Sequence, residues 1–180
     1  MDANALRRLY DSIRDVHDFP KPGIVFKDIS PLLLSPELFE LSIQGMAEPL
    51  RDLAVERVMA IDSRGFIFGA PLAIRLGAGL VLARKAGKLP WKTRRADYEL
   101  EYGTDAIEVH TDAIESGHRV LVVDDLLATG GTASAAAEIV SGAGAELVGF
   151  SFLVELAFLN GREKLPDSTI FSLLRYPRCE

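Results

Sequence analysis

The chain has 180 residues, of which 20 are basic and 26 are acidic, so its formal net charge is −6. This length fits one domain, with or without a small appendage, and is sufficient to bury a hydrophobic core. The negative net charge argues against nucleic acid or an anionic membrane as a partner, because proteins that bind them usually carry net positive charge. The single cysteine, Cys179, excludes an internal disulfide and fits a reducing compartment.

The sequence contains no segment that qualifies as a membrane span. Its most apolar stretch, residues 65–83, is interrupted by Pro71 and Arg75, whereas a span needs about 20 apolar residues. The N-terminal residues lack the basic-then-apolar order of a secretory signal. We therefore expect a cytoplasmic protein.

The N-terminal third is predicted to form two helices separated by a rigid turn. Apolar side chains recur at helical spacing over residues 6–16, which predicts an amphipathic helix. Two prolines and a glycine in residues 18–23 end that helix, and residues 24–29 have the pattern of a short extended segment. Ser35 followed by Pro36 predicts the start of a second helix, which we expect to reach about Leu53.

From residue 57 onward, short apolar strands alternate with helices, a pattern typical of a parallel sheet covered on both faces. The expected strands cover residues 58–61, 80–83, 119–123, 147–153 and 169–174, and the expected helices cover residues 66–76 and 133–140. Residues 85–110 differ, because a polar loop there precedes two alternating segments, residues 98–102 and 106–110. The fold class is thus α/β, with a parallel Rossmann-like sheet flanked by helices and an antiparallel flap.

The most informative motif is residues 120–132, in which a buried strand leads through two acids and a glycine–threonine loop into a helix. Asp124 and Asp125 stand at the C-terminal end of the predicted strand, the edge at which open α/β sheets bind ligands. The loop meets a helix N-terminus, where unpaired N–H groups and the helix dipole favour an anion. Its glycines let the backbone approach that anion closely, and its threonine hydroxyls add donors.

These features predict a site for ribose 5-phosphate, with the phosphate at residues 129–132 and the two carboxylates on the sugar hydroxyls. The alternative interpretation is a capped turn with solvated acids, but the glycine–threonine loop favours a ligand site. No lysine follows the glycines, so the loop is not a Walker loop. A receiver domain would explain Asp124 and Asp125 but not the loop that follows them.

Basic residues are concentrated between positions 84 and 95, where six of the 20 fall with no acid among them. A solvated loop is the usual explanation of such a cluster. This loop, however, leaves the C-terminal end of a predicted strand, and so does the turn at residues 62–65. Both therefore lie at the same sheet edge as the phosphate motif, where a diphosphate would need positive charge.

Residues 120–132 resemble the phosphoribosyl pyrophosphate motif of the type I phosphoribosyltransferases. The chain resembles the adenine-specific members of that family in five further stretches, residues 19–31, 62–66, 84–90, 98–103 and 161–165. The resemblance covers nearly the whole chain in the family's order. It implies one type I phosphoribosyltransferase domain over residues 1–180, with a small hood at about residues 1–34 and a flexible flap at about residues 85–110.

The resemblance also implies the reaction: adenine and 5-phosphoribosyl 1-pyrophosphate give AMP and pyrophosphate. Mg²⁺ is expected as the cofactor, held mainly by the substrate near Asp124 and Asp125 with no ligand set of the protein's own. A homodimer is expected as well. Two alternatives stay open, namely transfer to hypoxanthine, guanine or xanthine, and a non-catalytic regulator that senses phosphoribosyl pyrophosphate.

Residue roles follow from the same resemblance. The 5-phosphate and ribose are expected to contact Asp124, Asp125, Ala128, Thr129, Gly130, Gly131 and Thr132. The diphosphate is expected to contact Asp62, Ser63, Arg64, Lys85 and Lys88, with a cis peptide between the first two, and adenine to contact Val25, Phe26, Lys27 and Leu127. Glu101 is expected to be the catalytic acid or base, Arg64 to stabilise the leaving group, and Tyr102 to act with the flap.

Overall fold

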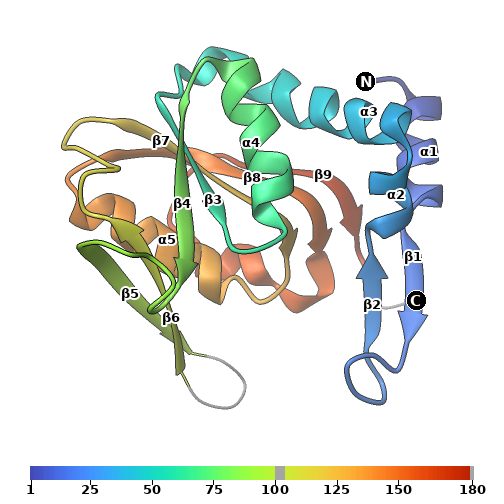
Figure 1. The fold of residues 1–180 in the computed structure, drawn as a ribbon. Helices are drawn as coiled ribbons and strands as arrows, with labels where there is room; N and C mark the ends of the chain where they lie inside the picture. Colours follow the sequence, from blue (N-terminus) through green and yellow to red (C-terminus); the bar gives the residue numbers. More distant parts are fainter. Residues whose placement is uncertain (100–103, 179–180) are drawn as a thin grey trace.

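A computed structural model of the protein describes residues 1–99 and 104–178. The helices and strands are, in chain order (Figure 1), α1 (Ala3–Asp11), β1 (Arg14–His17), β2 (Val25–Asp28), α2 (Ser30–Leu34), α3 (Pro36–Ala47), β3 (Arg57–Ile61), α4 (Gly65–Leu76), β4 (Gly79–Lys85), β5 (Thr93–Glu99), β6 (Thr104–His110), β7 (Arg119–Leu127), α5 (Gly131–Gly142), β8 (Glu146–Leu156) and β9 (Ile170–Tyr176). Three 3₁₀ helices cover Glu48–Leu53, Ala157–Leu159 and Gly161–Lys164. Within the described ranges, no helix is long and apolar enough to cross a membrane.

Seven strands form one sheet in the order β5-β6-β4-β3-β7-β8-β9. Neighbouring strands pair in parallel along the run β4-β3-β7-β8-β9. β5 pairs antiparallel with β6, and β6 pairs antiparallel with β4, which joins both strands to the sheet. The predicted α/β class with a parallel sheet is confirmed. The β1–β2 hairpin forms a separate small sheet, and in Figure 1 it and the β5–β6 pair project past the end of the sheet, on opposite sides of the molecule.

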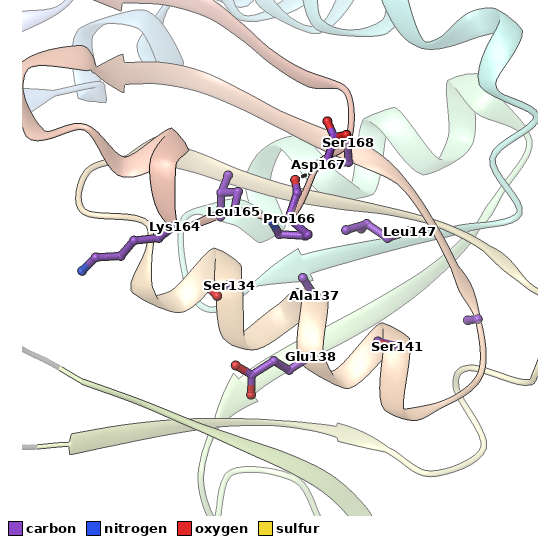
Figure 2. A pocket seen from close by; sticks show the side chains of 11 residues that line it. Ser134, Ala137, Glu138, Ser141, Leu147, Lys164, Leu165, Pro166, Asp167 and Ser168 are labelled. Atoms are coloured by element: carbon purple, nitrogen blue, oxygen red, sulfur yellow. Dashed lines mark hydrogen bonds between the residues drawn. The ribbon is translucent and has the colours of Figure 1, made fainter.

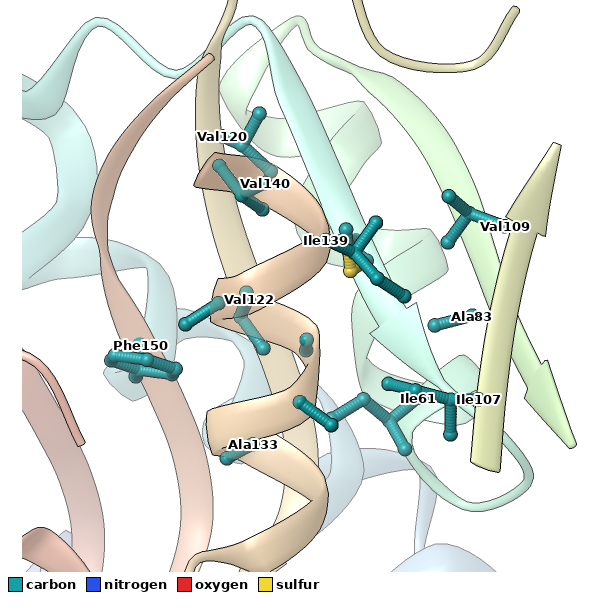
Figure 3. Close-up of a cluster of buried hydrophobic side chains, with 14 of the residues drawn as sticks. Ile61, Ala83, Ile107, Val109, Val120, Val122, Ala133, Ile139, Val140 and Phe150 are labelled. Atoms are coloured by element: carbon teal, nitrogen blue, oxygen red, sulfur yellow. The ribbon is translucent and has the colours of Figure 1, made fainter. Parts of the chain in front are cut away.

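Helices cover both faces of the sheet. The sheet therefore separates two clusters of buried hydrophobic side chains, one on each face. On one face, Leu121 and Val123 of β7 pack with residues of α1 to α4. On the other face, Val120 and Val122 of the same strand pack beneath α5 with Phe150 of β8 (Figure 3). Because both faces of each central strand are buried, these strands are continuous apolar runs rather than alternating ones.

The ends of the first two predicted helices differ most from the sequence-based prediction. The first helix ends at Asp11, and Val16 lies in β1 opposite Phe26 of β2. Residues 14–17 also fit the helical spacing, but pairing with β2 makes them a strand. The second helix, α3, gives way to the 3₁₀ helix Glu48–Leu53 instead of continuing to residue 53. Pro49 accounts for this change, since it has no N–H to donate to the preceding turn.

The strand that precedes the phosphate motif is also longer than predicted. It was expected over residues 119–123, but β7 continues to Leu127, so that Asp124 and Asp125 lie within the strand and not after it. The reason is that β8 is itself long and keeps pairing with β7, with Leu127 opposite Glu155. Both carboxylates are therefore held by the sheet rather than by a loop.

Candidate active site

The phosphate motif forms a strand, a three-residue turn and a helix start. Residues 128–130 connect β7 to α5, and Gly130 caps the helix with φ +81°, a left-handed conformation that glycine adopts without a steric cost. The turn encloses a small hollow of about 90 Å³. Its lining residues are Asp124, Leu126, Leu127, Ala128, Thr129, Gly130, Gly131, Thr132 and Ala133. The first turn of α5 thus presents its free N–H groups to a cavity.

Asp124 and Asp125 form an electrostatically coupled pair beside this hollow. Asp124 accepts a hydrogen bond from the backbone N–H of Asp125 at 2.8 Å. Burial and the neighbouring Asp125 carboxylate raise the pKa of Asp124 well above its ordinary value. Burial also raises the pKa of Asp125, although the Arg64 guanidinium opposes that rise. The protein alone therefore stabilises the ionised forms of these two carboxylates poorly. A bound cation or hydroxyl donors would stabilise them.

Arg64 reaches the same carboxylates from the neighbouring strand–helix connection. Its Nε lies 3.0 Å from Oδ2 of Asp125, but the angles are not those of a hydrogen bond. That buried oxygen consequently has no hydrogen-bond partner within the described ranges. The Arg64 guanidinium also lies 5.1 Å from the centre of the Phe26 ring, which links the β1–β2 hairpin to the sheet edge.

The turn at Asp62 and Ser63 follows β3 directly, and the peptide between these residues is cis, as predicted. Asp62 donates its backbone N–H to Ala83 of β4 at 2.8 Å. Its carboxylate accepts a hydrogen bond from Arg84 Nε at 3.0 Å. The turn is thus fixed to the adjacent parallel strand and lies at the sheet edge next to the phosphate motif.

The predicted basic loop is divided between two strands and their connection. Arg84 and Lys85 end β4, whereas Arg94 and Arg95 belong to β5, so the expectation of one loop holding all six basic residues is wrong. The reason is that antiparallel pairing with β6 extends β5 back to Thr93.

Lys85 is held by an acid that the sequence did not single out. Its Nζ lies 3.3 Å from Asp105 Oδ2, and this contact raises the pKa of Lys85. Asp105 also accepts a hydrogen bond from the Tyr98 hydroxyl at 3.2 Å. Burial raises the pKa of Tyr98, while a hydrogen bond with Thr132 of the phosphate motif lowers it. The β5–β6 pair therefore contacts the start of α5.

The hairpin residues Val25, Phe26 and Lys27 lie on β2, but their side chains diverge. Phe26 packs edge-on against Phe19 at 5.2 Å between ring centres and faces Arg64. Lys27 is buried, with its Nζ 2.6 Å from Asp15 Oδ1 and 4.3 Å from the centre of the Tyr176 ring. The Lys27 side chain thus connects the hairpin to β9 and does not join the other predicted site residues.

Not every predicted site residue can be placed. Glu101 and Tyr102 lie outside the described residues, between Glu99 of β5 and Thr104 of β6. The backbone of Lys88 is held at both ends: its carbonyl accepts a hydrogen bond from Arg84 at 3.1 Å, and its N–H donates to the carbonyl of Lys85 at 3.1 Å.

Sequence reasoning missed one ion pair near the site, in which the acid is buried. Glu155 of β8 accepts two hydrogen bonds from Arg162, at 2.7 and 2.6 Å. A glutamate inside an otherwise apolar strand was a signal that could have been used, because a buried acid requires a partner. The sequence does not reveal which cation that partner would be.

A larger groove, of about 500 Å³, lies on the side of α5 that faces the segment after Lys164 (Figure 2). Ser134, Glu138 and Ser141 of α5 line one wall, and residues 164–168 line the other. None of the predicted site residues is among its lining residues. The larger groove is therefore distinct from the hollow at the phosphate motif.

Comparisons with known proteins agree with this arrangement. A model of the phosphoribosyl transferase domain matches residues 42–174. The crystal structure of adenine phosphoribosyltransferase from Rhodothermus marinus superposes with a TM-score of 0.93 and 51% identity, covering 97% of this chain and 100% of that one. The corresponding enzyme from Saccharomyces cerevisiae, crystallised with an imino-altritol bisphosphate and adenine, gives a TM-score of 0.91 at 40% identity over 96% of this chain and 100% of that one.

Two relatives match nearly the whole chain with comparable identity. The adenine phosphoribosyltransferase of Synechocystis is 51% identical over 178 residues, which cover 98% of this chain and 100% of the relative. That of Anaeromyxobacter dehalogenans strain 2CP-1 is 56% identical over 164 residues, covering 91% and 95% respectively. The chain therefore belongs to the phosphoribosyltransferase family. Within that family, its similarity is to the adenine phosphoribosyltransferases.

Proposed function

We propose that the protein is the enzyme that transfers the 5-phosphoribosyl group of 5-phosphoribosyl 1-pyrophosphate to adenine, giving AMP and pyrophosphate. The observation that carries this proposal is the junction of β7 and α5, where two carboxylates adjoin a helix N-terminus that opens on a hollow. Identity of 51% to an adenine phosphoribosyltransferase along essentially its whole length supports adenine as the base. Hypoxanthine, guanine and xanthine become the poorer substrates.

The sugar phosphate is assigned to the β7–α5 junction. The backbone N–H groups of residues 129–132 and the threonine hydroxyls would bind the 5-phosphate, with the helix dipole adding to the attraction. The carboxylates of Asp124 and Asp125 would accept hydrogen bonds from the 2′- and 3′-hydroxyls. Ala128 belongs to the same turn and Leu127 ends the strand that leads into it. Binding energy from this remote phosphate would hold the reacting carbon in place.

The diphosphate is assigned to the turn at Asp62, Ser63 and Arg64 and to the cations Lys85 and Lys88. Arg64 and Lys85 are each paired with an acid, Asp125 and Asp105 respectively. Such pairs keep the cations close to the site, and a more highly charged anion would draw them away from the acids. Because charge develops on the leaving group as its bond to C1 lengthens, these cations would stabilise the transition state.

Mg²⁺ fits the carboxylates of this site. An oxygen of Asp125 that lacks a hydrogen-bond partner within the described ranges, and two acids with raised pKa, are what a divalent cation would compensate. Asp124 and Asp125 would hold the ion together with waters and substrate oxygens, as Mg²⁺ prefers. The bound ion would neutralise charge on the diphosphate.

The purine is assigned to the β1–β2 hairpin and the end of β7. The ring would stack on Phe26, its edge would be read by backbone groups at Val25 and Lys27, and Leu127 would contact its other side. The buried position of the Lys27 side chain supports a backbone role for this residue. Phe26 lies over Arg64, so that base and diphosphate would be adjacent.

Proton transfer to or from the purine is assigned to Glu101, with Tyr102 beside it, on the family resemblance alone. Closure of the flap at about residues 85–110 would exclude water, which would otherwise hydrolyse the sugar diphosphate. We treat the chain as one phosphoribosyltransferase domain over residues 1–180, with the hood at about residues 1–34.

A homodimer and a cytoplasmic location complete the proposal. Three exposed apolar side chains on neighbouring elements, Ile74 of α4 and Leu80 and Leu82 of β4, supply a surface for the dimer. The single cysteine supports a reducing compartment. The net charge of −6 supports small-molecule substrates rather than nucleic acid or a membrane.

The decisive experiment measures pyrophosphate release from 5-phosphoribosyl 1-pyrophosphate and Mg²⁺ with each purine in turn. Adenine should exceed the other purines in kcat/KM by at least about 100-fold, since the edge of a purine is discriminated by hydrogen bonds. Thr132→Ala should raise KM for the sugar diphosphate because it removes a donor at the phosphate. Absence of turnover with every purine would contradict the proposal and favour a regulator.

A further inference from the structure

The buried carboxylate of Glu155 and the half-buried guanidinium of Arg162 form an ion pair that connects three segments of the chain. Glu155 is 2% exposed, and both of its oxygens accept hydrogen bonds from the Arg162 guanidinium, at 2.7 and 2.6 Å. Arg162 also donates to the backbone carbonyl of Ile170 at 3.0 Å and to the hydroxyl of Ser172 at 3.3 Å. The guanidinium therefore connects its own turn to β8 and to β9.

Gly161, the residue before Arg162, is in direct backbone contact with residues 128–130, the turn between β7 and α5 that we call the phosphate turn. A Cβ atom added to Gly161 would lie 2.2 Å from the carbonyl oxygen of Ala128 and 3.1 Å from the backbone nitrogen of Gly130. In the opposite direction, a Cβ atom on Gly130 would lie 2.3 Å from the carbonyl oxygen of Gly161. The turn at Gly161 and the turn that precedes α5 thus pack backbone against backbone, without side chains between them.

This packing makes the position of the phosphate turn depend on the position of Gly161. Gly161 is adjacent in sequence to Arg162. The Arg162 guanidinium is fixed by charge-assisted hydrogen bonds to Glu155, which lies on strand β8 of the central sheet. The pairing lowers the pKa of Glu155 against the opposing effect of burial and raises the pKa of Arg162, so both groups are charged at neutral pH. A displacement of about 1 Å in such a support can cost about 100-fold in catalysis.

We propose that Glu155 and Arg162 are positioning residues for phosphoribosyl pyrophosphate: they hold Gly161 against residues 128–130 and so set the backbone donors that receive the 5-phosphate. They act through the turn and do not touch the substrate. This inference rests on the proposed function, since it concerns the same phosphate site. Arg175, which lies 3.3 Å from Glu155 and is largely exposed, makes no hydrogen bond to the turn at Gly161 within the described ranges.

Steady-state kinetics and calorimetric binding of ribose 5-phosphate test the inference on full-length variants. Arg162→Gln should raise KM for phosphoribosyl pyrophosphate and Kd for ribose 5-phosphate by about 10-fold or more, while KM for adenine changes less than about twofold. Arg162→Lys should be intermediate because an ammonium cannot reproduce the fork. The matched control Arg175→Gln removes a charge from the same carboxylate and should leave both constants within about twofold.

A second variant keeps the test decisive if Arg162→Gln does not fold. Gly161→Ala leaves the ion pair intact and has no unusual backbone angle to satisfy, but it pushes on Ala128 and Gly130. It should reproduce the selective loss of ribose 5-phosphate affinity. If the wild type binds ribose 5-phosphate and Gly161→Ala binds it equally well, or if both substrates weaken together, the positioning role is wrong. A wild type that neither binds it nor releases pyrophosphate contradicts the proposed function itself.

Discussion

At the scale of single residues, the candidate site is built from groups that weaken the fold. Asp124 and Asp125 are adjacent acids on a buried strand, and burial raises the pKa of each. A folded-state pKa above the ordinary value means that ionisation opposes folding, so this pair reduces stability at neutral pH. Under the proposed function, a ligand that brings hydroxyl donors and a cation to this pair would offset the loss of stability.

Asp124→Asn should therefore stabilise the free protein and impair it as an enzyme. The amide keeps the acceptor for the backbone N–H of Asp125 but carries no charge. Because the pKa of Asp124 is raised in the folded state, the wild type loses stability as pH rises above the ordinary value of 3.8. The variant lacks this loss, so its advantage in stability should be absent near pH 3 and should grow as the pH rises toward 8.

Denaturant unfolding at several pH values measures this advantage, and steady-state kinetics should show a KM for phosphoribosyl pyrophosphate at least about 10-fold higher. A useful control is Asp112→Asn, an exposed acid in the turn after β6, which should change neither quantity. A variant less stable than the wild type at pH 8 would contradict the argument.

The residues of the phosphate motif could be found from the sequence because they are contiguous and each has a local physical reason. Their supporting partners could not. Asp105 contacts Lys85 only because β6 pairs with β4. Arg162 contacts Glu155 only because the turn at Gly161–Lys164, which follows β8, folds back against that strand. Such long-range pairs depend on register, which a single sequence does not specify for short strands.

At the scale of elements, boundaries that depend on local chemistry were predicted well and those that depend on pairing were not. The start of α3 is an example of the first kind, since Ser35 accepts a hydrogen bond from the backbone of Leu38 and Pro36 occupies the first turn. β1 is an example of the second kind. Its four residues carry no strand pattern and become a strand only by pairing with β2.

Ser35→Ala should consequently destabilise the protein by about 1 kcal/mol, the usual effect of removing an N-terminal cap. α3 packs against α1, α2, α4, β8 and β9 and contributes no residue to the proposed site, so kcat/KM should stay within about twofold of the wild type. Ser168→Ala serves as the control: it removes a half-buried loop hydroxyl that donates only to the nearby Pro166 carbonyl, at 3.2 Å, and should change stability by less than about 0.5 kcal/mol. Equal stability of the two variants in denaturant unfolding would refute the capping argument.

At the scale of the whole molecule, the parallel sheet explains why separate segments of sequence form one site. β3, β4 and β7 are neighbours and run in the same direction, so the turn at residues 62–65, the end of β4 and the phosphate motif meet at one edge. The alternation of strands and helices was enough to predict this meeting. It did not predict the surface that the same sheet leaves uncovered.

That uncovered surface lies on α4 and β4. Ile74 is 83% exposed, and Leu80 and Leu82, which share one face of β4, are 42% and 41% exposed. Large exposed apolar side chains on two elements in contact are typical of a protein–protein interface. Burying it between two copies of the chain would remove it from water, as the proposed homodimer requires.

The variant Ile74→Asp/Leu82→Asp should therefore be monomeric at concentrations where the wild type is a dimer, because each association would bury four new carboxylates. Sedimentation velocity measures the mass directly. Leu34→Asp is the matched control, since Leu34 of α2 is 81% exposed but lies on a different helix, and it should leave the dimer intact. A wild type that sediments as a monomer, or a double variant that sediments as a dimer, would exclude this face as the interface.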